Sequence, residues 1–275
     1  MTRTELDAVV EWAAAEGWNP GWHDADTFHA TDPDGFLLGL IDGEPVATIS
    51  AVRYGERFGF IGFYIVRPGF RGRGYGLSIW NAAMQRLAGR TIGLDGVVAQ
   101  QESYRRSGFE LAWNNVRYEG LARPWNGLDA AIVQVDPGRA ETSGLLAYDT
   151  AFFPDDRHRF VRRWVAQPRS TSLMIRREGQ VAGYGVIRPC RVGFKVGPLF
   201  ANDPELADRL LRALIARAEP GAPVQLDIPA VNPSALDLVQ AHAMRPVFET
   251  ARMYAGRAPC LPLERMFGIT TYELG

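Results

Sequence analysis

A glycine-rich stretch at residues 71–76, with the sequence RGRGYG, constrains the fold more than any other part of the chain. Before it, Phe58–Val66 is almost continuously apolar, as in a strand that is buried on both faces. After it, apolar residues recur at helical spacing, namely Leu77, Trp80, Met84 and Leu87. The chain is therefore predicted to run from a buried strand through a glycine turn into an amphipathic helix.

The residues of this turn are suited to binding phosphate. Gly72, Gly74 and Gly76 let the backbone turn freely and leave their amide groups open to an anion. A helix N-terminus attracts anions, and Arg71 and Arg73 add positive charge. We therefore predict a phosphate cradle, formed by Arg71, Gly72, Arg73, Gly74, Tyr75 and Gly76.

Glycine-rich turns of other kinds also bind phosphate or connect a strand to a helix. A P-loop is excluded because no Gly-Lys pair followed by Ser or Thr opens the helix. A dinucleotide-binding turn agrees with Asp95, about 20 residues further on, but Ile79 occupies the position of its third glycine. A plain turn without a ligand also stays open at this point.

Two motifs resemble those of a known family. Residues 66–76, VRPGFRGRGYG, resemble the acetyl-CoA motif of the GCN5-related N-acetyltransferases (the GNAT family), which Arg71, Gly74 and Gly76 match. Residues 104–109, YRRSGF, resemble the Tyr, three residues, Gly-Phe signature that closes the family's catalytic domain. The two motifs follow in the family's order, and the resemblance covers roughly residues 1–120.

This resemblance implies both a cosubstrate and a fold. In the family, the amides of the first motif hold the pyrophosphate of acetyl-CoA, and the preceding strand, here Tyr64, Ile65 and Val66, pairs with the pantetheine arm. The implied fold is a mixed α/β (α+β) GNAT-like fold, with a mainly antiparallel sheet, flanking helices and one parallel pair of strands that splay apart. The acetyl-pantetheine arm enters the gap between those two strands.

Acetyl transfer from a thioester to an amine needs a neutral amine, a stabilised oxyanion and a protonated leaving thiolate. By resemblance, Tyr104 is the candidate general acid, although a tyrosine packed under the sheet is the structural alternative. The sequence does not identify the general base, and the candidates are Asp95, Asp24, Glu102 and Tyr64. Asp95 stands out because a carboxylate within an apolar strand costs free energy unless it is functional or paired, for example with an arginine.

The remaining elements of the first half follow from local signals. A helix is predicted from a Thr4 cap to about Glu16, and a hairpin from Phe36–Ile41 and residues 46–54. A buried strand is predicted over residues 92–98, followed by a short helix that carries Tyr104 and by a last strand around residues 117–120.

The second half reads as a degenerate copy of the first. We predict a catalytic domain at 1–124, a degenerate GNAT-like domain at 128–256, and a tail at 257–275 that docks on another surface or subunit. Where the copy should have a cradle, Asp203 and Glu205 place negative charge at a helix start, and Val239 occupies the tyrosine position. This half is therefore predicted to bind no coenzyme A and to be structural, or to form a wall of the acceptor pocket.

Composition limits the partners. The net charge of -1 gives no broad attraction to nucleic acid or to an anionic membrane, and neither is predicted as a partner. Cys190 and Cys260 are far apart and form no metal motif, so no metal is predicted. Without a signal-peptide pattern or a transmembrane run, the expected location is cytoplasmic. Monomer and homodimer both stay open.

We predict an N-acetyltransferase that passes the acetyl group of acetyl-CoA directly to a primary amine of a small molecule or peptide. No covalent intermediate is expected, because no nucleophilic Cys or Ser with a neighbouring His can be placed. A non-catalytic acyl-CoA-binding or regulatory protein is the main alternative, since the base is not readable. A nucleotide-dependent oxidoreductase is a weaker alternative that depends on Asp95.

Overall fold

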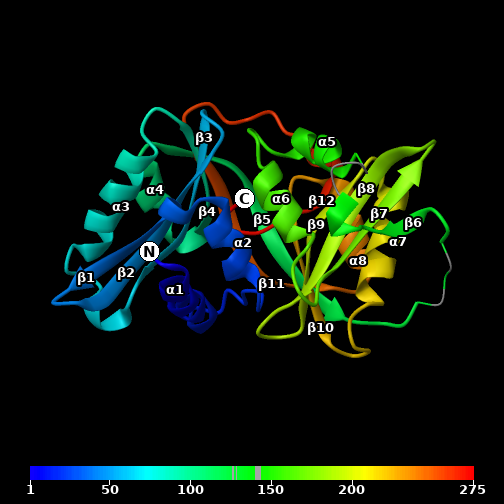
Figure 1. Cartoon of the computed structure of the whole chain (residues 1–275), viewed down its shortest axis with the longest axis horizontal. Helices are drawn as coiled ribbons and strands as arrows, with labels where there is room; N and C mark the ends of the chain where they lie inside the picture. Colours follow the sequence, from blue (N-terminus) through cyan, green and yellow to red (C-terminus); the bar gives the residue numbers. More distant parts are fainter. Residues whose placement is uncertain (126, 128, 140–143) are drawn as a thin grey trace.

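The computed structural model of the chain describes residues 1–125, 127, 129–139 and 144–275. In these ranges, one continuous twelve-stranded sheet runs through the whole molecule in the order β1-β2-β3-β4-β11-β5-β10-β9-β8-β7-β6, with β12 paired to β9 (Figure 1). The strands are β1 (Phe36–Ile41), β2 (Glu44–Tyr54), β3 (Phe58–Val66), β4 (Thr91–Val97), β5 (Phe109–Leu121), β6 (Ile132–Gln134), β7 (Thr171–Arg177), β8 (Gln180–Pro189), β9 (Phe194–Ala201), β10 (Pro223–Pro229), β11 (Arg245–Ala255) and β12 (Met266–Gly268).

Helices cover this sheet on the outside and fill the space between its two halves. In Figure 1, α3 and α4 lie on the outer side of the first half, α7 and α8 on that of the second, and α2 and α6 lie side by side in the middle, where they pack on each other. The α-helices are α1 (Arg3–Ala15), α2 (Asp24–Thr31), α3 (Tyr75–Arg86), α4 (Gln101–Arg106), α5 (Leu145–Asp149), α6 (His158–Trp164), α7 (Pro204–Ile215) and α8 (Pro233–Ala241). The predicted fold class, a mixed sheet with flanking helices that occurs twice, is confirmed.

Most predicted elements lie within a few residues of their expected positions. The first helix differs, because its cap lies two residues before the predicted cap at Thr4. Thr2, and not Thr4, caps α1, because the side chain of Thr2 accepts the Glu5 N–H while the Glu5 carboxylate accepts the Thr2 N–H. This capping box satisfies two backbone donors at once, which a cap at Thr4 could not do. The predicted domain junction lies partly outside the described residues, since 126 and 128 are not among them.

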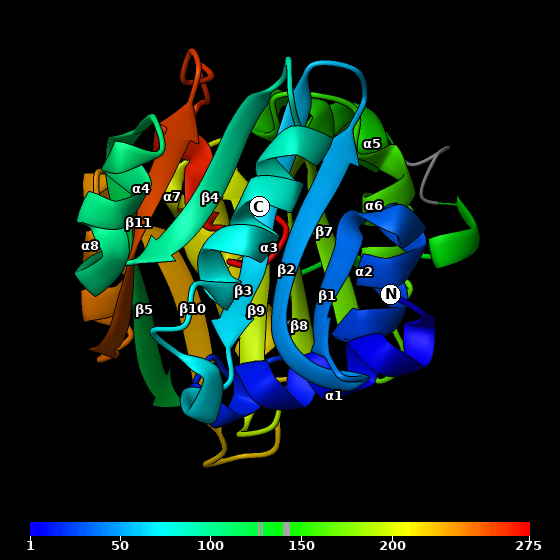
Figure 2. The same ribbon diagram turned by 90° about the vertical axis from the view of Figure 1, so that its left-hand side faces the viewer.

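The two halves exchange strands. β11, the last long strand of the second half, inserts between β4 and β5 of the first, and both of its pairings are antiparallel. β5 in turn pairs with β10 of the second half. In Figure 2, β5 and β11 lie next to each other. The strand predicted around residues 117–120 as the last of the first unit is part of β5, and its pairing with β10 joins the two halves.

Each exchanged strand carries an arginine that pairs with a buried aspartate of the other half. Arg252 on β11 lies opposite Asp95 on β4, with guanidinium–carboxylate distances of 2.6 and 2.8 Å. Arg117 on β5 lies opposite Asp227 on β10, at 2.6 and 2.8 Å. The two pairs are equivalent in the tandem arrangement. They fix the register of the exchange, because a slip of one residue would leave buried charges without partners.

In the first half, β3 and β4 diverge. They pair in parallel only from Phe58 and Thr91 to Ile61 and Leu94, and beyond this point both strands continue without pairing to each other. The register of β3 against β2 also shifts between Gly62 and Ile65, and Phe63 within this bulge has a φ of +47°. A bulge increases the local twist of a strand, which turns β3 away from β4.

In the second half, the corresponding gap is filled by the tail. β9 and β10 pair in parallel only as far as Val196 and Leu226. β12 then pairs with β9, and the Ile269 N–H donates to the Asp227 carbonyl of β10 at 2.8 Å. Of the two places predicted for the tail, another surface or another subunit, the structure shows a surface of this same chain, because the buried apolar residues of the tail belong to its core.

The rest of the tail runs from this filled gap towards the open one. At Gly197, a Cβ atom would lie 2.5 Å from the Thr270 carbonyl, and at Gly62 a Cβ atom would lie 2.1 Å from the Glu273 carbonyl. Glycine is therefore required at both crossings. The chain ends at Gly275 in the interior, near the centre of Figure 1.

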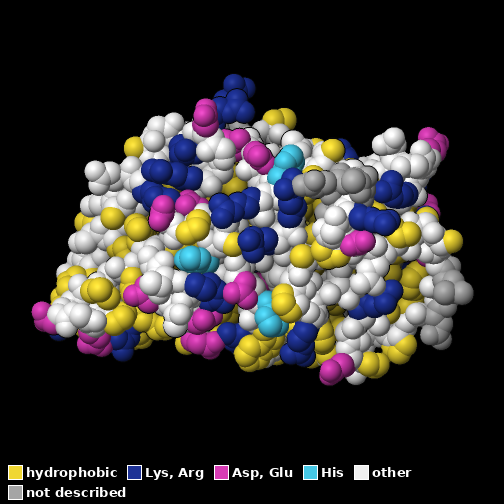
Figure 3. Space-filling view, in the orientation of Figure 1, with side chains coloured by type: hydrophobic (Ala, Val, Ile, Leu, Met, Phe, Trp, Pro, Cys, Tyr) yellow, Lys and Arg dark blue, Asp and Glu magenta, His cyan; other side chains and the backbone are white. Residues whose placement is uncertain are grey.

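The surface carries mixed charge. On the face shown in Figure 3, basic, acidic and hydrophobic side chains are interspersed over both halves. Among the described residues, no helix is both long and apolar enough to cross a membrane.

Candidate active site

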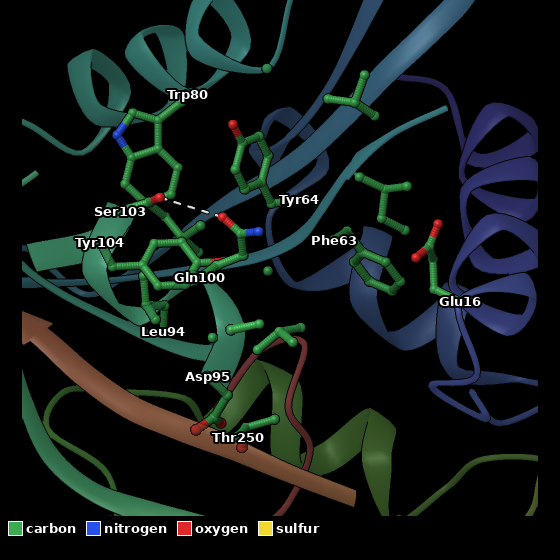
Figure 4. A pocket seen from close by; sticks show the side chains of 18 of the residues that line it. Glu16, Phe63, Tyr64, Trp80, Leu94, Asp95, Gln100, Ser103, Tyr104 and Thr250 are labelled. Carbon is green, nitrogen blue, oxygen red and sulfur yellow. Dashed lines mark hydrogen bonds between the residues drawn. The ribbon is translucent and has the colours of Figure 1, made fainter. Parts of the chain in front are cut away.

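A cavity of about 580 Å³ opens where β3 and β4 diverge. Its walls come from the end of α1, from β3, the glycine turn, α3, β4 and α4, and from β11 and the tail. This volume is in the range of small-molecule and cofactor sites. Figure 4 shows Tyr64, Trp80, Gln100, Ser103 and Tyr104 gathered on one side of the cavity, with Glu16 and Phe63 on the other.

The glycine turn forms the outer end of the cavity. Gly72 and Gly74 have φ values of +76° and +85°, a region that favours glycine, and a Cβ atom at either position would meet nothing within 4 Å. Gly74 is the N-cap of α3, and no side chain caps this helix. The first N–H groups of α3 therefore have no side-chain acceptor and are available to an anion.

The other predicted cradle residues are placed differently. Arg71 lines the cavity, but its guanidinium binds the Glu16 carboxylate at 2.5 Å and the Val66 carbonyl at 2.8 Å. An anion at the turn must therefore compete with Glu16 for Arg71. Arg73 and Tyr75 do not line the cavity, and both lie beside the Phe70 ring instead.

The strand that is predicted to meet the pantetheine arm faces the cavity. Tyr64, Ile65 and Val66 all line it, along the part of β3 that has left β4. Gly76 allows α3 to approach this strand closely, because a Cβ atom there would lie 2.8 Å from the Tyr64 hydroxyl. The backbone of β3 can therefore pair with an extended ligand, in the manner of an added strand.

Tyr104 lies on α4 between the sheet and Trp80. Its ring centroid is 5.6 Å from that of Trp80, and a Cβ atom at Gly96 would lie 2.3 Å from the Tyr104 ring, so glycine on β4 makes room for it. Burial, and to a lesser degree Tyr64, raise the pKa of Tyr104 to about 12. The phenol therefore keeps its proton at neutral pH, and its hydroxyl makes no hydrogen bond to the described residues. These properties suit a proton donor.

Asp95, the second predicted catalytic residue, is held in the ion pair with Arg252 and also accepts a hydrogen bond from Asn115 at 2.7 Å. Burial raises the pKa of its carboxyl, and the Arg252 guanidinium offsets part of this shift. Asp227 makes the same pair in the second half, where the gap is filled by β12. The pair therefore occurs without an open cavity, which supports a structural role for Asp95.

Sequence reasoning missed the residues that close the inner end of the cavity. They come from segments with no recognisable motif, namely Phe248 and Thr250 on β11 and Tyr272 and Glu273 in the tail. Only the strand exchange and the path of the tail bring them to β3. The second half thus contributes a wall of this cavity.

In the corresponding region of the second half, the N-terminus of α7 is capped by a side chain. The Asp203 side chain caps α7 by accepting the Leu206 N–H at 2.9 Å, so a carboxylate already occupies the helix N-terminus. Val239, at the position equivalent to Tyr104, is fully buried in the core. Within the described ranges, no group of three or more His, Cys, Asp and Glu side chains is placed to hold a metal ion.

Comparison with known proteins gives two family matches. The model described as "Acetyltransferase (GNAT) family" matches residues 5–109, and the one described as "Acetyltransferase (GNAT) domain" matches residues 145–268. The chain is also 29% identical over 271 residues to the holothin acyltransferase of Pseudoalteromonas sp. (strain SANK 73390), which covers 98% of this chain and 92% of that protein.

Two solved structures share the fold. A Pyrococcus horikoshii protein assigned as an acetyltransferase superposes with a TM-score of 0.82 at 24% identity, over 100% of this chain and 94% of that one. A tandem GNAT protein from the clavulanic acid biosynthesis pathway gives a TM-score of 0.55 at 13% identity, over 94% of this chain and 98% of that one.

Proposed function

The chain belongs to the GNAT family of acyltransferases, with two GNAT domains in tandem, and from this premise we propose that it transfers the acetyl group of acetyl-CoA to a primary amine. The first half binds acetyl-CoA and carries out the chemistry. The second half binds no coenzyme A.

The observation that carries this proposal is the order of groups along one cavity. The uncapped N-terminus of α3 lies at its outer end, the unpaired part of β3 follows, and Tyr104 lies beside β4. An acyl-CoA needs an anion site for its pyrophosphate, a strand edge for its pantetheine amides and a proton donor near its sulfur, in this order.

The inner end of the gap favours a short acyl group. β3 and β4 are paired up to Ile61 and Leu94, and these two buried apolar residues line the cavity where the gap begins. An acyl chain that enters between the strands meets this apolar wall, which leaves room for an acetyl group more readily than for a long chain. The name of the holothin acyltransferase supports acyl transfer, and holothin belongs among the first acceptors to test.

Calorimetric titration with acetyl-CoA tests the cradle. We expect about one site per chain, and loss of binding in Gly74→Glu, because this change places a carboxylate at the anion site. Gly89→Glu is the matched control: Gly89 follows the other end of α3, has a φ of +81° and also has open space around its Cβ position. Both variants carry the same backbone strain, so only a loss specific to Gly74→Glu supports the cradle.

The result also separates the proposal from its main alternative. Binding together with release of free coenzyme A when amines are added supports the enzyme. Binding without release under any amine favours a non-catalytic acyl-CoA-binding protein. No binding by the intact chain would overturn the proposal.

A further inference from the structure

The inner end of the cavity holds buried polar atoms without partners. Glu273 Oε1, Thr250 Oγ1 and Tyr272 OH are all buried in the lining of the cavity, and apart from a contact between the two hydroxyls none has a hydrogen-bond partner among the described residues. Leaving such atoms unpaired costs free energy, and the cost is larger for a charged group. Their gathering in one place points to a polar ligand.

Glu273 is held firmly by its own segment. Its N–H donates to the Thr271 hydroxyl at 3.1 Å, and this hydroxyl donates to Glu273 Oε2. Its carbonyl lies against Gly62, at the bulge where β3 leaves β4. One carboxylate oxygen is thus fixed while the other, Oε1, is left for a ligand.

Three buried cations act on Glu273, and two of them have other carboxylate partners. Arg117, Arg188 and Lys195 are the buried cations that interact with this carboxylate. Arg117 is paired with Asp227, and Arg188 with Asp24 at 2.8 Å. Among the described residues, Lys195 has no carboxylate within ion-pair distance, and its ammonium donates to the Trp18 carbonyl at 3.4 Å. Burial lowers the pKa of Lys195. Glu273 is the third carboxylate among these three cations, and its Oε1 still has no hydrogen-bond partner among the described residues.

The walls beside this carboxylate are aromatic. Trp18, Phe63 and Phe248 line the same cavity, each from a different segment. Aromatic walls next to a single open carboxylate oxygen match a molecule with an apolar or aromatic body and one ammonium group.

We propose that the acceptor is a small primary alkylamine with an aromatic or otherwise apolar body, and that Glu273 of the C-terminal tail binds its ammonium group and removes a proton from it. This inference rests on the proposed function. It places the general base outside the first half, on a segment that reaches the site only because the tail crosses β3 at Gly62.

The protons balance as follows. Glu273 takes one proton from the ammonium, and the neutral nitrogen then attacks the thioester carbonyl to form the C–N bond. As the C–S bond breaks, Tyr104 gives its proton to the leaving sulfur, and the tyrosinate takes the second proton from the nitrogen. The products are the amide and free coenzyme A, and the proton on Glu273 is released to solvent.

Two amines test this role with acetyl-CoA as donor. 2-Phenylethylamine is an ammonium ion at neutral pH, whereas phenylhydrazine is already neutral and needs no base before it attacks. In Glu273→Gln we expect kcat/KM for 2-phenylethylamine to fall by about 100-fold or more, and that for phenylhydrazine by less than about 10-fold. Raising the pH to about 9.5 should recover part of the loss with 2-phenylethylamine, because more of this amine is then neutral in solution.

The controls separate chemistry from structure. Acetyl-CoA affinity should stay within about 2-fold in Glu273→Gln, since the cradle is untouched. Glu264→Gln, the same change at an exposed position of the same tail, should leave both amines unaffected. If Glu273→Gln does not fold, Glu273→Asp keeps the charge and should show the same order of losses at smaller size.

Each outcome decides a separate point. Equal losses for the two amines, or a loss without recovery at high pH, would assign Glu273 a structural role and overturn the inference while the proposed function stands. An unchanged rate would also overturn it. If the intact chain binds acetyl-CoA but uses neither amine, the proposed acceptor class is wrong. If it binds no acetyl-CoA, the proposed function itself fails.

Discussion

At the scale of single residues, the backbone of Phe63 shows how the fold opens the cavity. Phe63 adopts a φ of +47° at the bulge of β3, a conformation that costs a residue with a side chain roughly 1–2 kcal/mol. Such strain persists where the surrounding structure enforces it, often at functional sites. Here it lies at the point where β3 leaves β4.

Tyr104→Phe should lower kcat by about 100-fold and leave acetyl-CoA affinity within about 2-fold, because only the proton donor is removed. Thiol release and calorimetry measure the two quantities. Tyr118→Phe, a tyrosine of β5 that does not line the cavity, is the matched control. An unchanged kcat in Tyr104→Phe would contradict the assigned role.

The pH profile gives an independent test of Tyr104. Its pKa is raised to about 12 by burial, so the protonated, donating form is fully present below this pH and is lost only as the pH rises through about 12. We therefore expect no fall of kcat between about pH 7 and pH 10 from loss of this proton. A descending limb in this range that disappears in Tyr104→Phe would show that the phenol is more acidic than its burial implies.

At the scale of elements, the exchange of β5 and β11 explains why the central strands contain buried charged residues. A carboxylate within an apolar strand is ambiguous in the sequence, since catalysis and pairing both explain it. Asp95 and Asp227 each meet an arginine of the exchanged strand, but only the first half has an open cavity. The repeated pair favours a role in holding the exchange together.

Asp95→Asn and Asp227→Asn should therefore lower the free energy of unfolding by similar amounts, about 3–5 kcal/mol, because each leaves a buried arginine without its partner. Denaturant unfolding measures this. Asp7→Asn removes an exposed pair with Arg3 and should cost less than about 1 kcal/mol. A normal stability for Asp95→Asn together with lost turnover would instead restore Asp95 as a catalytic residue.

At the scale of the whole molecule, the two halves form one structural unit. The sheet is continuous from β1 to β6, and one hydrophobic core contains residues of α1, α2, α6, β3 and the tail together. We expect calorimetric unfolding to show a single cooperative transition, since neither half keeps its central sheet without the other.

A fragment of residues 1–124 tests this point, because its β5 would lack both of its neighbours, β10 and β11. We expect no cooperative transition from it. Two separate transitions in the intact chain, or a folded fragment that binds acetyl-CoA, would show that the halves are independent.

What the sequence alone determined is local. Periodicity located the strands and helices, the glycines and Arg71 marked the turn, and two short motifs indicated the family, because propensity, backbone freedom and spacing act over a few residues. The absence of a second cradle was also readable, since Asp203 lies at the helix start itself.

Only the tertiary structure decided which strands pair and where the tail lies. β5 has the same apolar pattern whether it pairs within its own half or with β10. The pattern therefore does not specify which strand lies next to it. Glu273 is one carboxylate in a segment without a motif, and its place beside the bulge of β3 follows from contacts between residues more than 200 positions apart. Such contacts depend on packing of the complete chain, so the inner end of the cavity could not be read from any local stretch.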